Sequence, residues 1–423
     1  MRGYEEMLGA IFFAYLFVIL SDYWLKYLNL SRLKKQGTFI PPEFEGSIDQ
    51  ALLRKTRDYV IENTKYEVLL SLFQSSILLI FLFGNLFAWY NSWVVSLQMP
   101  FVLSGLLFFL FLLYADTFLT IPFKLYHTFK IENTYGFTTT TLKLWITDFI
   151  KSLMVSTILT AIVISAGLFI VQKSPHLWWF WVWCFFFAFS IIIMYLFPYV
   201  IAPIFNKFTP IEDETLKAGI QNIMKKVGIK VKQVFQMDAS RRTKHTNAYF
   251  TGIGKVKRIV LYDTLVDTMN SGEILSVLAH EAGHWKKRHL LKHLIASEII
   301  ALFVMFVVHK LLQNDFLIDL FHVKESTFLA KVVIISFLGS IVSYPFSPLK
   351  NYFSRRNEFA ADLFSNEITG DSRSMISTLV KLSRDNLSNL HPHPLYAAFH
   401  YSHPPVLERI RAIQKWEKNK RTG

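Results

Sequence analysis

Cysteine and charged residues are both scarce in this chain of 423 residues. The one cysteine, Cys184, excludes an intramolecular disulfide and any zinc site built from several thiolates. Charged residues make up 18% of the chain, whereas hydrophobic residues make up 52% and include 40 phenylalanines. This composition, with its positive mean hydropathy, indicates repeated membrane spans rather than one soluble core.

Long apolar runs recur along the chain, each near the length of about twenty residues that a helix needs to cross a bilayer. The first run has no small-residue cleavage signature at its end, so it predicts a retained anchor rather than a removed signal peptide. An odd number of spans places the two termini on opposite sides of the membrane. The seven predicted spans are Leu8–Leu25, Val68–Tyr90, Phe101–Thr120, Ser152–Val171, Leu177–Ile201, Leu290–Leu312 and Leu329–Pro348.

The net charge of +14 would suit a nucleic-acid partner, but its distribution favours a membrane explanation. The loop 26–67 carries eight Lys and Arg residues, whereas the loop 91–100 carries none. The positive-inside rule then places the loops 26–67, 121–151 and 202–289 and the C-terminal tail in the cytoplasm. We therefore expect a multi-pass protein of a bacterial cytoplasmic membrane or, in a eukaryote, of the endoplasmic reticulum, with no nucleic-acid partner.

The longest polar segment lies between the fifth and sixth spans and predicts a small α+β unit on the membrane surface. Apolar residues at helical spacing predict a helix over residues 214–229. Asn270, followed three residues later by Glu273, forms a capping pair that predicts the start of a second helix. Short strands are expected around Gly252 and Gly254, over residues 231–238, 247–253 and 258–265.

This second helix carries the motif His-Glu-x-x-His, made by His280, Glu281 and His284. Two histidines one turn apart share a helix face and can hold one zinc ion, while the glutamate acts as general base for the attacking water. Two further histidines, His289 and His293, lie about 180° and 220° away from His280 on a continuous helix. We therefore expect them at the membrane interface and away from the metal.

A catalytic zinc keeps three protein ligands, so a third ligand is needed. The astacin-type extension of the motif is excluded, because Lys287 and Leu290 stand where it requires glycine and histidine. A distant carboxylate remains, and Glu358 is the candidate. Asp362 lies one turn later on the same predicted helix, where it would hydrogen-bond a ligand histidine. The alternative for both carboxylates is a solvated helix face, and the upstream motif favours the metal role.

Five separated stretches together resemble the type I CaaX prenyl proteases, which are integral-membrane zinc metallopeptidases. The stretches are HEAGHWKKRH, NYFSRRNEFAAD, MDASRRTKHTNAYFTGI, FKIENTYGF and YSHPPVLERI. The resemblance implies a mainly α-helical membrane protein with seven helices around a water-filled chamber, closed on the cytoplasmic side by the zinc domain. It also implies one Zn²⁺ per chain and removal of the C-terminal tripeptide that follows a prenylated cysteine.

The resemblance assigns further residues to the site, beyond His280, His284 and Glu358 as zinc ligands. Strand residues Asn247, Ala248 and Tyr249 would pair with the substrate main chain. His403 would stabilise the developing oxyanion, with helix capping before Pro404 as the alternative. Arg355 would pair with carboxylates or with a peptide C-terminus, and a structural salt bridge is the alternative.

The resulting domain organisation has four parts. We expect spans one to five over residues 1–201, the α+β unit with the motif helix over 202–289, spans six and seven over 290–348, and helices that complete the zinc site over 349–423. Polar residues inside the spans fit this arrangement, because charges in a membrane need water or a partner. We expect Gln74 and Asn85 to bond between helices, and Asp116 and Glu298 to face a wet interior.

Three other interpretations compete with a CaaX protease. A heat-shock-type quality-control metallopeptidase would have fewer spans than this chain. A site-2-type intramembrane protease would bury its motif in lipid, which the charged run Lys286–Arg288 opposes. A transporter with a structural zinc would normally use four Cys or His ligands and would leave Glu281 without a task.

Overall fold

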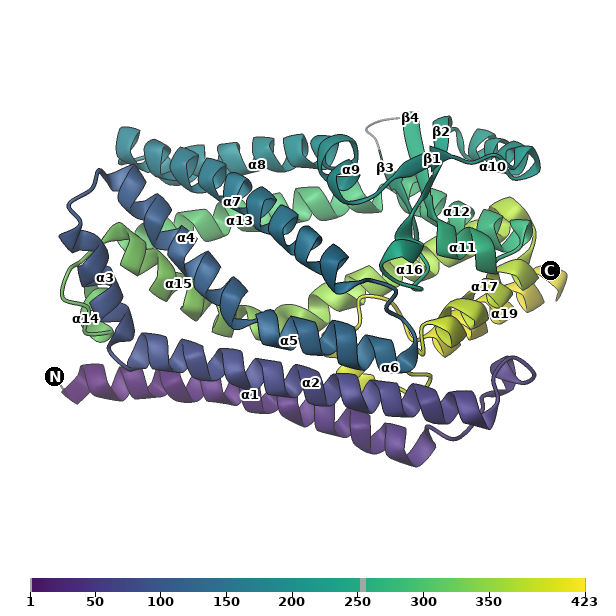
Figure 1. Ribbon diagram of the computed structural model, residues 1–423, viewed down its shortest axis with the longest axis horizontal. Helices are drawn as coiled ribbons and strands as arrows, with labels where there is room; N and C mark the ends of the chain where they lie inside the picture. Colours follow the sequence, from purple (N-terminus) through teal and green to yellow (C-terminus); the bar gives the residue numbers. More distant parts are fainter. Residues whose placement is uncertain (1, 252–255, 423) are drawn as a thin grey trace.

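Membrane-capable helices dominate the computed structural model, which describes residues 2–251 and 256–422 (Figure 1). Seven of the described helical segments are long and apolar enough to cross a membrane, so the predicted number and order of spans are confirmed. Their main helices are α1 (Arg2–Gln36), α2 (Gln50–Phe83), α4 (Phe101–Leu119), α7 (Leu142–Lys173), α8 (Trp178–Leu196), α13 (His289–Leu312) and α15 (Phe328–Ser343).

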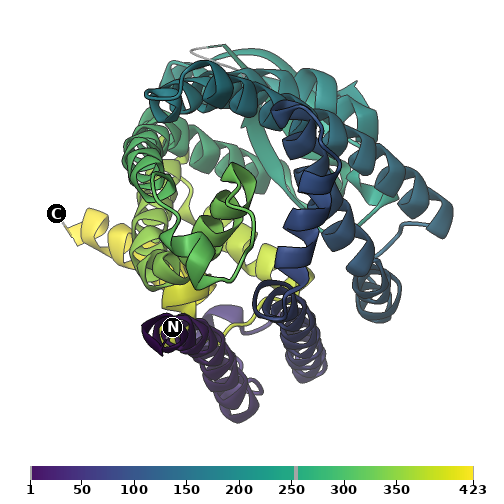
Figure 2. The same ribbon diagram turned by 90° about the vertical axis from the view of Figure 1, so that its left-hand side faces the viewer.

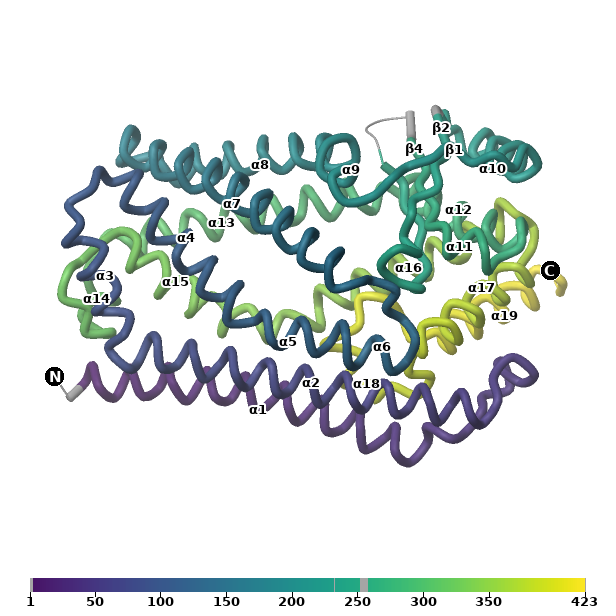
Figure 3. The backbone as a smooth tube through the Cα atoms, viewed as in Figure 1, coloured from purple at the N-terminus to yellow at the C-terminus, as the bar shows by residue number. Residues whose placement is uncertain are grey.

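The shorter elements gather toward the two ends of the spans (Figures 1 and 3). At the end that holds the N-terminus lie α3 (Leu86–Ser96) and α14 (Phe316–Leu320). The sheet and the C-terminus lie at the opposite end, as the odd number of spans requires. The remaining helices either lie at the end that holds the sheet or lead from the spans to it. They are α5 (Ile121–Tyr126), α6 (Asn133–Tyr135), α9 (Ala202–Phe205), α10 (Glu214–Val227), α11 (Asp263–Thr268), α12 (Ser271–Lys286), α16 (Ser347–Thr369), α17 (Ser372–Asp385), α18 (Pro394–His400) and α19 (Val406–Thr422).

The second span ends earlier than predicted. Helix α2 stops at Phe83, Gly84 follows as its C-cap, and Asn85 adopts the left-handed conformation with φ 62°. Asparagine tolerates this conformation better than most residues, so the Gly-Asn pair redirects the chain into α3. The expectation that Asn85 lies inside a span and bonds to a neighbouring helix is therefore wrong.

The long helices stand in a ring when they are viewed end-on (Figure 2). In six of the seven spans no more than 11% of the most apolar window is buried, and in the sixth span none of it is. A tightly packed bundle would bury one face of every helix, so this low burial supports the expected open interior. Asp116 is exposed and Glu298 is half-buried, which is compatible with the wet interior expected for them. Gln74 is exposed, so it is not packed between helices, contrary to the prediction.

The α+β unit contains a mixed four-stranded sheet in the order β1-β2-β4-β3. The central strands β2 (Lys230–Met237) and β4 (Val256–Tyr262) are parallel, and β1 (Phe208–Pro210) and β3 (Ala248–Thr251) add antiparallel edges. Strand β1 was not predicted. The predicted strand over 258–265 ends at Tyr262, because Asp263 begins α11 and its carboxylate accepts the backbone N–H of Thr264. Gly252 and Gly254 lie outside the described residues.

The core of this unit fixes the motif helix α12. Asn270 and Glu273 form the predicted capping box at its start, with both reciprocal hydrogen bonds present. Fully buried apolar residues from α10, β4 and α12, among them Ile220, Ile259 and Leu278, pack in one cluster. Burying each such side chain stabilises the fold by about 1.5–3 kcal/mol, so α12 is a rigid support.

A short antiparallel contact joins the membrane helices to the sheet. Thr138 pairs with Thr243, and the N–H of Lys244 donates to the carbonyl of Phe137 over 2.9 Å. The ring of His245 stacks on Phe137 with centroids 4.3 Å apart. The loop after span three therefore holds the segment that leads into the edge strand β3.

We predict that His245 makes the fold more stable at low pH. Its Nε2 lies 3.3 Å from a carboxylate oxygen of Glu132 and its Nδ1 lies 2.6 Å from Oδ1 of Asn386, so only the charged ring donates to both. The contact with Glu132 raises the pKa of His245 above its ordinary value of 6.5. The contribution of His245 to the free energy of unfolding is therefore full below pH 6.5 and is lost as the pH rises through the raised pKa.

The measurement is the melting temperature of detergent-purified wild type and of His245→Ala between about pH 5.5 and 8.5. Both proteins share every other titrating group, so the difference between their melting temperatures reports on His245. The gap should narrow as the pH rises. A gap that is constant or widens would contradict the role assigned to this histidine.

Candidate active site

Two helices far apart in the sequence bring the predicted metal ligands together. His280 and His284 lie one turn apart on α12, and Glu358 lies on α16. One ligand atom from each residue lies within 4.8 Å of the other two. The Nε2 atoms of the two histidines are 3.1 Å apart, and they lie 3.4 and 3.2 Å from the carboxylate oxygens of Glu358.

These separations fit one tetrahedral metal ion. A zinc ion with bonds of about 2.0–2.1 Å keeps its ligand atoms about 3.3 Å apart. Oε2 of Glu358 is also buried, and although Nδ1 of His403 and Nε2 of His280 lie 2.8 and 3.4 Å away, neither makes a well-aligned hydrogen bond to it, which is costly for a carboxylate. Two imidazoles and one carboxylate are the donor set of many catalytic zinc sites, so the residues present fit this metal.

A buried charge pair supports the first histidine. Oδ1 of Asp362 lies 2.8 Å from Nδ1 of His280, and the predicted role of Asp362 in holding a metal-bound histidine stays a prediction. Arg409 on α19 donates to both carboxylate oxygens of Asp362, over 2.8 Å and 2.6 Å. The chain Arg409–Asp362–His280 thereby fixes the orientation of the ring and turns its Nε2 toward Glu358.

The same contacts control the proton on the first histidine. Burial lowers the pKa of His280, but contacts with Asp362 and Glu358 outweigh this effect and raise it to about 9. A metal ligand must be neutral imidazole, so metal binding has to displace this proton.

Glu281 and His403 are the two residues predicted to take part in catalysis. Burial raises the pKa of Glu281 above its ordinary value, which suits a carboxylate that must accept a proton. His403 lies between α18 and α19, and its Nδ1 is 2.8 Å from Oε2 of Glu358. Its side chain is 65% exposed, so a peptide could reach it from solvent.

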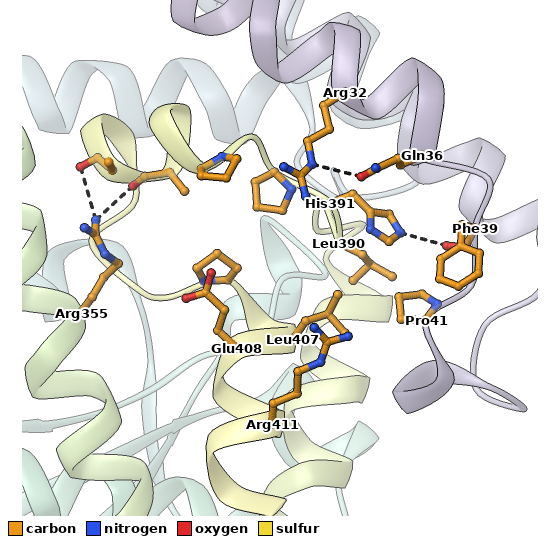
Figure 4. Close-up of a pocket in the computed structure, with 15 residues that line it drawn as sticks. Arg32, Gln36, Phe39, Pro41, Arg355, Leu390, His391, Leu407, Glu408 and Arg411 are labelled. Carbon is orange, nitrogen blue, oxygen red and sulfur yellow. Dashed lines mark hydrogen bonds between the residues drawn. The ribbon is translucent and has the colours of Figure 1, made fainter. Parts of the chain in front are cut away.

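Arg355 makes its described contacts with main-chain carbonyls. Its Nη1 donates to the carbonyl oxygens of Ala397 and Ala398 in the last turn of α18 (Figure 4). It also donates to the carbonyl oxygen of Tyr401, which follows α18. The guanidinium lies at the edge of a cavity of about 540 Å³. These bonds hold the turn that leads to His403, and a contact between Arg355 and substrate stays a prediction.

The predicted substrate strand lies at an edge of the sheet. Residues Ala248 and Tyr249 pair with β4 on one side, and no strand among the described residues pairs with the other side of β3. Asn247 precedes the strand, and its carbonyl accepts the N–H of Tyr262. Strand β3 packs against the motif helix α12.

Sequence reasoning missed two residues next to the site. His289 was expected on the far side of the helix, but α12 ends at Lys286 and a separate helix begins at His289. Its Nδ1 lies 3.0 Å from Nδ1 of His284, so that expectation is wrong. Arg409 stands within the stretch YSHPPVLERI, but no local pattern marks it as the partner of a buried carboxylate. His293 is exposed, and its predicted place at the membrane interface stays a prediction.

Comparison with known proteins finds relatives that match almost the whole chain. Residues 29–207 match the CAAX prenyl protease N-terminal family, described as five membrane helices, and residues 210–417 match peptidase family M48. A CAAX prenyl protease 1 homolog of Arabidopsis thaliana is 35% identical, with 98% of each chain covered. The CAAX prenyl protease 1 of Saccharomyces cerevisiae is 31% identical over 94% of this chain and 93% of the yeast protein.

A crystal structure of S. mikatae Ste24p has the same fold, with a TM-score of 0.87 and 30% sequence identity over 97% of this chain and 98% of that chain. The fold and the site define an integral-membrane metallopeptidase. The chain belongs to the CAAX prenyl protease family of M48 peptidases. The resemblance inferred from the five sequence stretches is confirmed, and the transporter interpretation is excluded.

We predict that Arg409 strengthens metal binding through Asp362. Replacing it with Leu leaves a buried carboxylate without its cation, so Asp362 holds His280 less firmly. Metal affinity should fall by about 10- to 100-fold. Chelator competition on the purified Arg409→Leu protein measures this change.

Arg411 offers a matched control two residues later on α19. It is exposed and pairs with Glu43, away from the metal ligands. The Arg411→Leu protein should keep wild-type metal affinity. Equal losses in both variants would show that any arginine on α19 has this effect and would refute the link through Asp362.

Proposed function

We propose that the chain is a zinc-dependent endopeptidase that removes the C-terminal tripeptide of prenylated CaaX proteins. The single observation that carries this proposal is the convergence of His280, His284 and Glu358 beside Glu281, at the end of the membrane helices. The names of the similar proteins support the substrate class, since they are CAAX prenyl proteases.

The proposed mechanism divides the work among four side chains. Zinc held by His280, His284 and Glu358 would polarise the scissile carbonyl and acidify the attacking water. Glu281 takes a proton from that water as it attacks, and passes the proton to the leaving amine when the peptide bond breaks. His403, 2.8 Å from Glu358, donates to the carbonyl oxygen as negative charge develops there.

Substrate alignment is assigned to the free edge of β3. A peptide that adds as a further strand bonds through its main chain, so Asn247, Ala248 and Tyr249 would fix its register and tolerate varied side chains. Such tolerance suits a protease whose substrates share only a modified cysteine near the C-terminus. Arg355 remains a candidate for the terminal carboxylate, through the guanidinium nitrogens that do not bond to α18.

We place the α+β unit on the cytoplasmic side of the membrane. The basic segment 26–67, which comprises the adjoining ends of α1 and α2 and the loop between them, lies at the same end as the sheet, and the charge-free segment 91–100, which includes the end of α3, lies at the other end (Figure 1). The eukaryotic origin of the relatives named above favours the endoplasmic reticulum over a bacterial cytoplasmic membrane. A different function, broad quality-control cleavage of membrane proteins, competes with CaaX processing. The rate of cleavage of an unprenylated peptide, compared with that of a prenylated one, decides between these two functions.

We predict that Glu281→Gln keeps zinc and loses turnover. Glutamine has nearly the same shape as glutamate but cannot accept the proton, and general-base catalysis contributes about 10²–10⁴-fold to such rates. Purified wild type and variant are compared for zinc content and for cleavage of a reporter peptide that ends in Cys-a-a-X.

The outcome with prenylated and unprenylated peptide tests the substrate class. Faster cleavage of the prenylated form by wild type supports CaaX processing. Equal cleavage of both forms would replace it with quality control. Near-normal cleavage by the Glu281→Gln protein would refute the assignment of the base.

We predict that the substrate main chain matters more than its side chains. N-methylation of one amide upstream of the scissile bond removes a donor to β3 and should lower kcat/KM by tenfold or more, since each main-chain bond contributes about 0.5–1.5 kcal/mol and the methyl group also clashes. Side-chain changes at the same position serve as controls and should have smaller effects. If every N-methylated peptide is cut normally, strand addition is wrong.

A further inference from the structure

His289 reaches the metal site because the helix breaks before it. Helix α12 ends at Lys286, and Arg288 adopts the left-handed conformation with φ 55° and ψ 37°. On an uninterrupted helix, His289 would point about 180° away from His280. The left-handed turn reverses this direction and returns the side chain to His284.

The contact with His284 is short and shielded from solvent. The Nδ1 atoms of His284 and His289 are 3.0 Å apart, and the rings meet edge-on at 76° with centroids 5.1 Å apart. His289 is 5% exposed, so water does not compete freely for this bond. A bulky left-handed residue is uncommon, and here its effect is to bury an imidazole against a ligand.

The direction of the hydrogen bond follows from the metal geometry. Nε2 of His284 faces His280 and Glu358 at 3.1 and 3.2 Å, so this nitrogen is the one that can bind a metal. A neutral imidazole that binds through Nε2 carries its proton on Nδ1 and donates from there. His289 must then accept through its own Nδ1.

We infer that His289 positions the metal ligand His284 by accepting a hydrogen bond from its Nδ1, and that the turn at Arg288 places His289 for this task. The inference rests on the proposed zinc site. The two ligand histidines are then held in different ways. Asp362 holds His280 with a carboxylate, whereas His289 holds His284 with a neutral ring. His289 is a positioning residue that does not touch substrate.

The test compares two replacements of His289 in the full-length protein. His289→Asn places an acceptor oxygen where Nδ1 lies, and His289→Leu fills a similar space without an acceptor. Zinc affinity is measured by chelator competition at fixed pH, independently of cleavage. The His289→Leu protein should bind zinc about 10- to 100-fold more weakly than wild type, and His289→Asn should recover most of the loss.

His293 provides the matched control, because it lies one turn later on α13 and does not contact the ligands. His293→Leu should keep wild-type affinity. Unchanged affinity in His289→Leu, or an equal loss in His289→Asn and His289→Leu, would overturn the role of His289. A wild type that fails to bind zinc would instead refute the proposed metal site itself, so the two failures are distinguishable.

Two further variants test the turn without changing either histidine. Glycine adopts the left-handed conformation at no steric cost, whereas a β-branched residue resists it. Arg288→Gly should therefore keep zinc affinity, and Arg288→Val should lose about as much as His289→Leu. If Arg288→Val binds zinc like wild type, the turn does not serve the metal site.

Discussion

The close packing of α12 against α16 is the contact on which the site depends. Gly283 lies between the two ligand histidines in this interface, where a Cβ atom would meet Ala361 Cα at 3.2 Å. Glycine therefore lets the two helices approach, and this approach brings Glu358 to His280 and His284. The capping box, the apolar cluster beneath α12 and the sheet all fix the position of this one helix.

The burial of negative charge is the second constraint, because only a few cationic or hydrogen-bonding groups compensate the two buried carboxylates of the site. Glu358 and Asp362 are 5% and 1% exposed, and a buried carboxylate is costly unless it is paired. Arg409 compensates Asp362 directly. Glu358 instead faces His280, His284 and His403 and has no cationic partner as close as that of Asp362. A divalent cation at this point would neutralise the negative charge of Glu358. The electrostatic arrangement thus favours metal binding at the place where the geometry allows it.

Features written in local sequence could be predicted, and features created by turns or tertiary pairing could not. The seven spans follow from long apolar runs, and the His280–His284 pair and the Asn270 cap follow from spacing along one helix. Helices end at the left-handed residues Asn85 and Arg288, although the apolar pattern alone predicts that they continue. For this reason the predicted positions of Asn85 and His289 were wrong. Arg409 finds Asp362 only after α16 and α19 pack, so spacing gives no sign of it.

Zinc K-edge X-ray absorption on the purified protein tests the central claim most directly, because it reports the donors around the metal without a substrate. The account predicts one zinc per chain with two imidazole nitrogens and carboxylate oxygen at about 2.0–2.1 Å, lost in the Glu358→Ala and His280→Ala proteins. A spectrum without imidazole scattering, or one that both substitutions leave unchanged, would place the metal elsewhere and contradict the account.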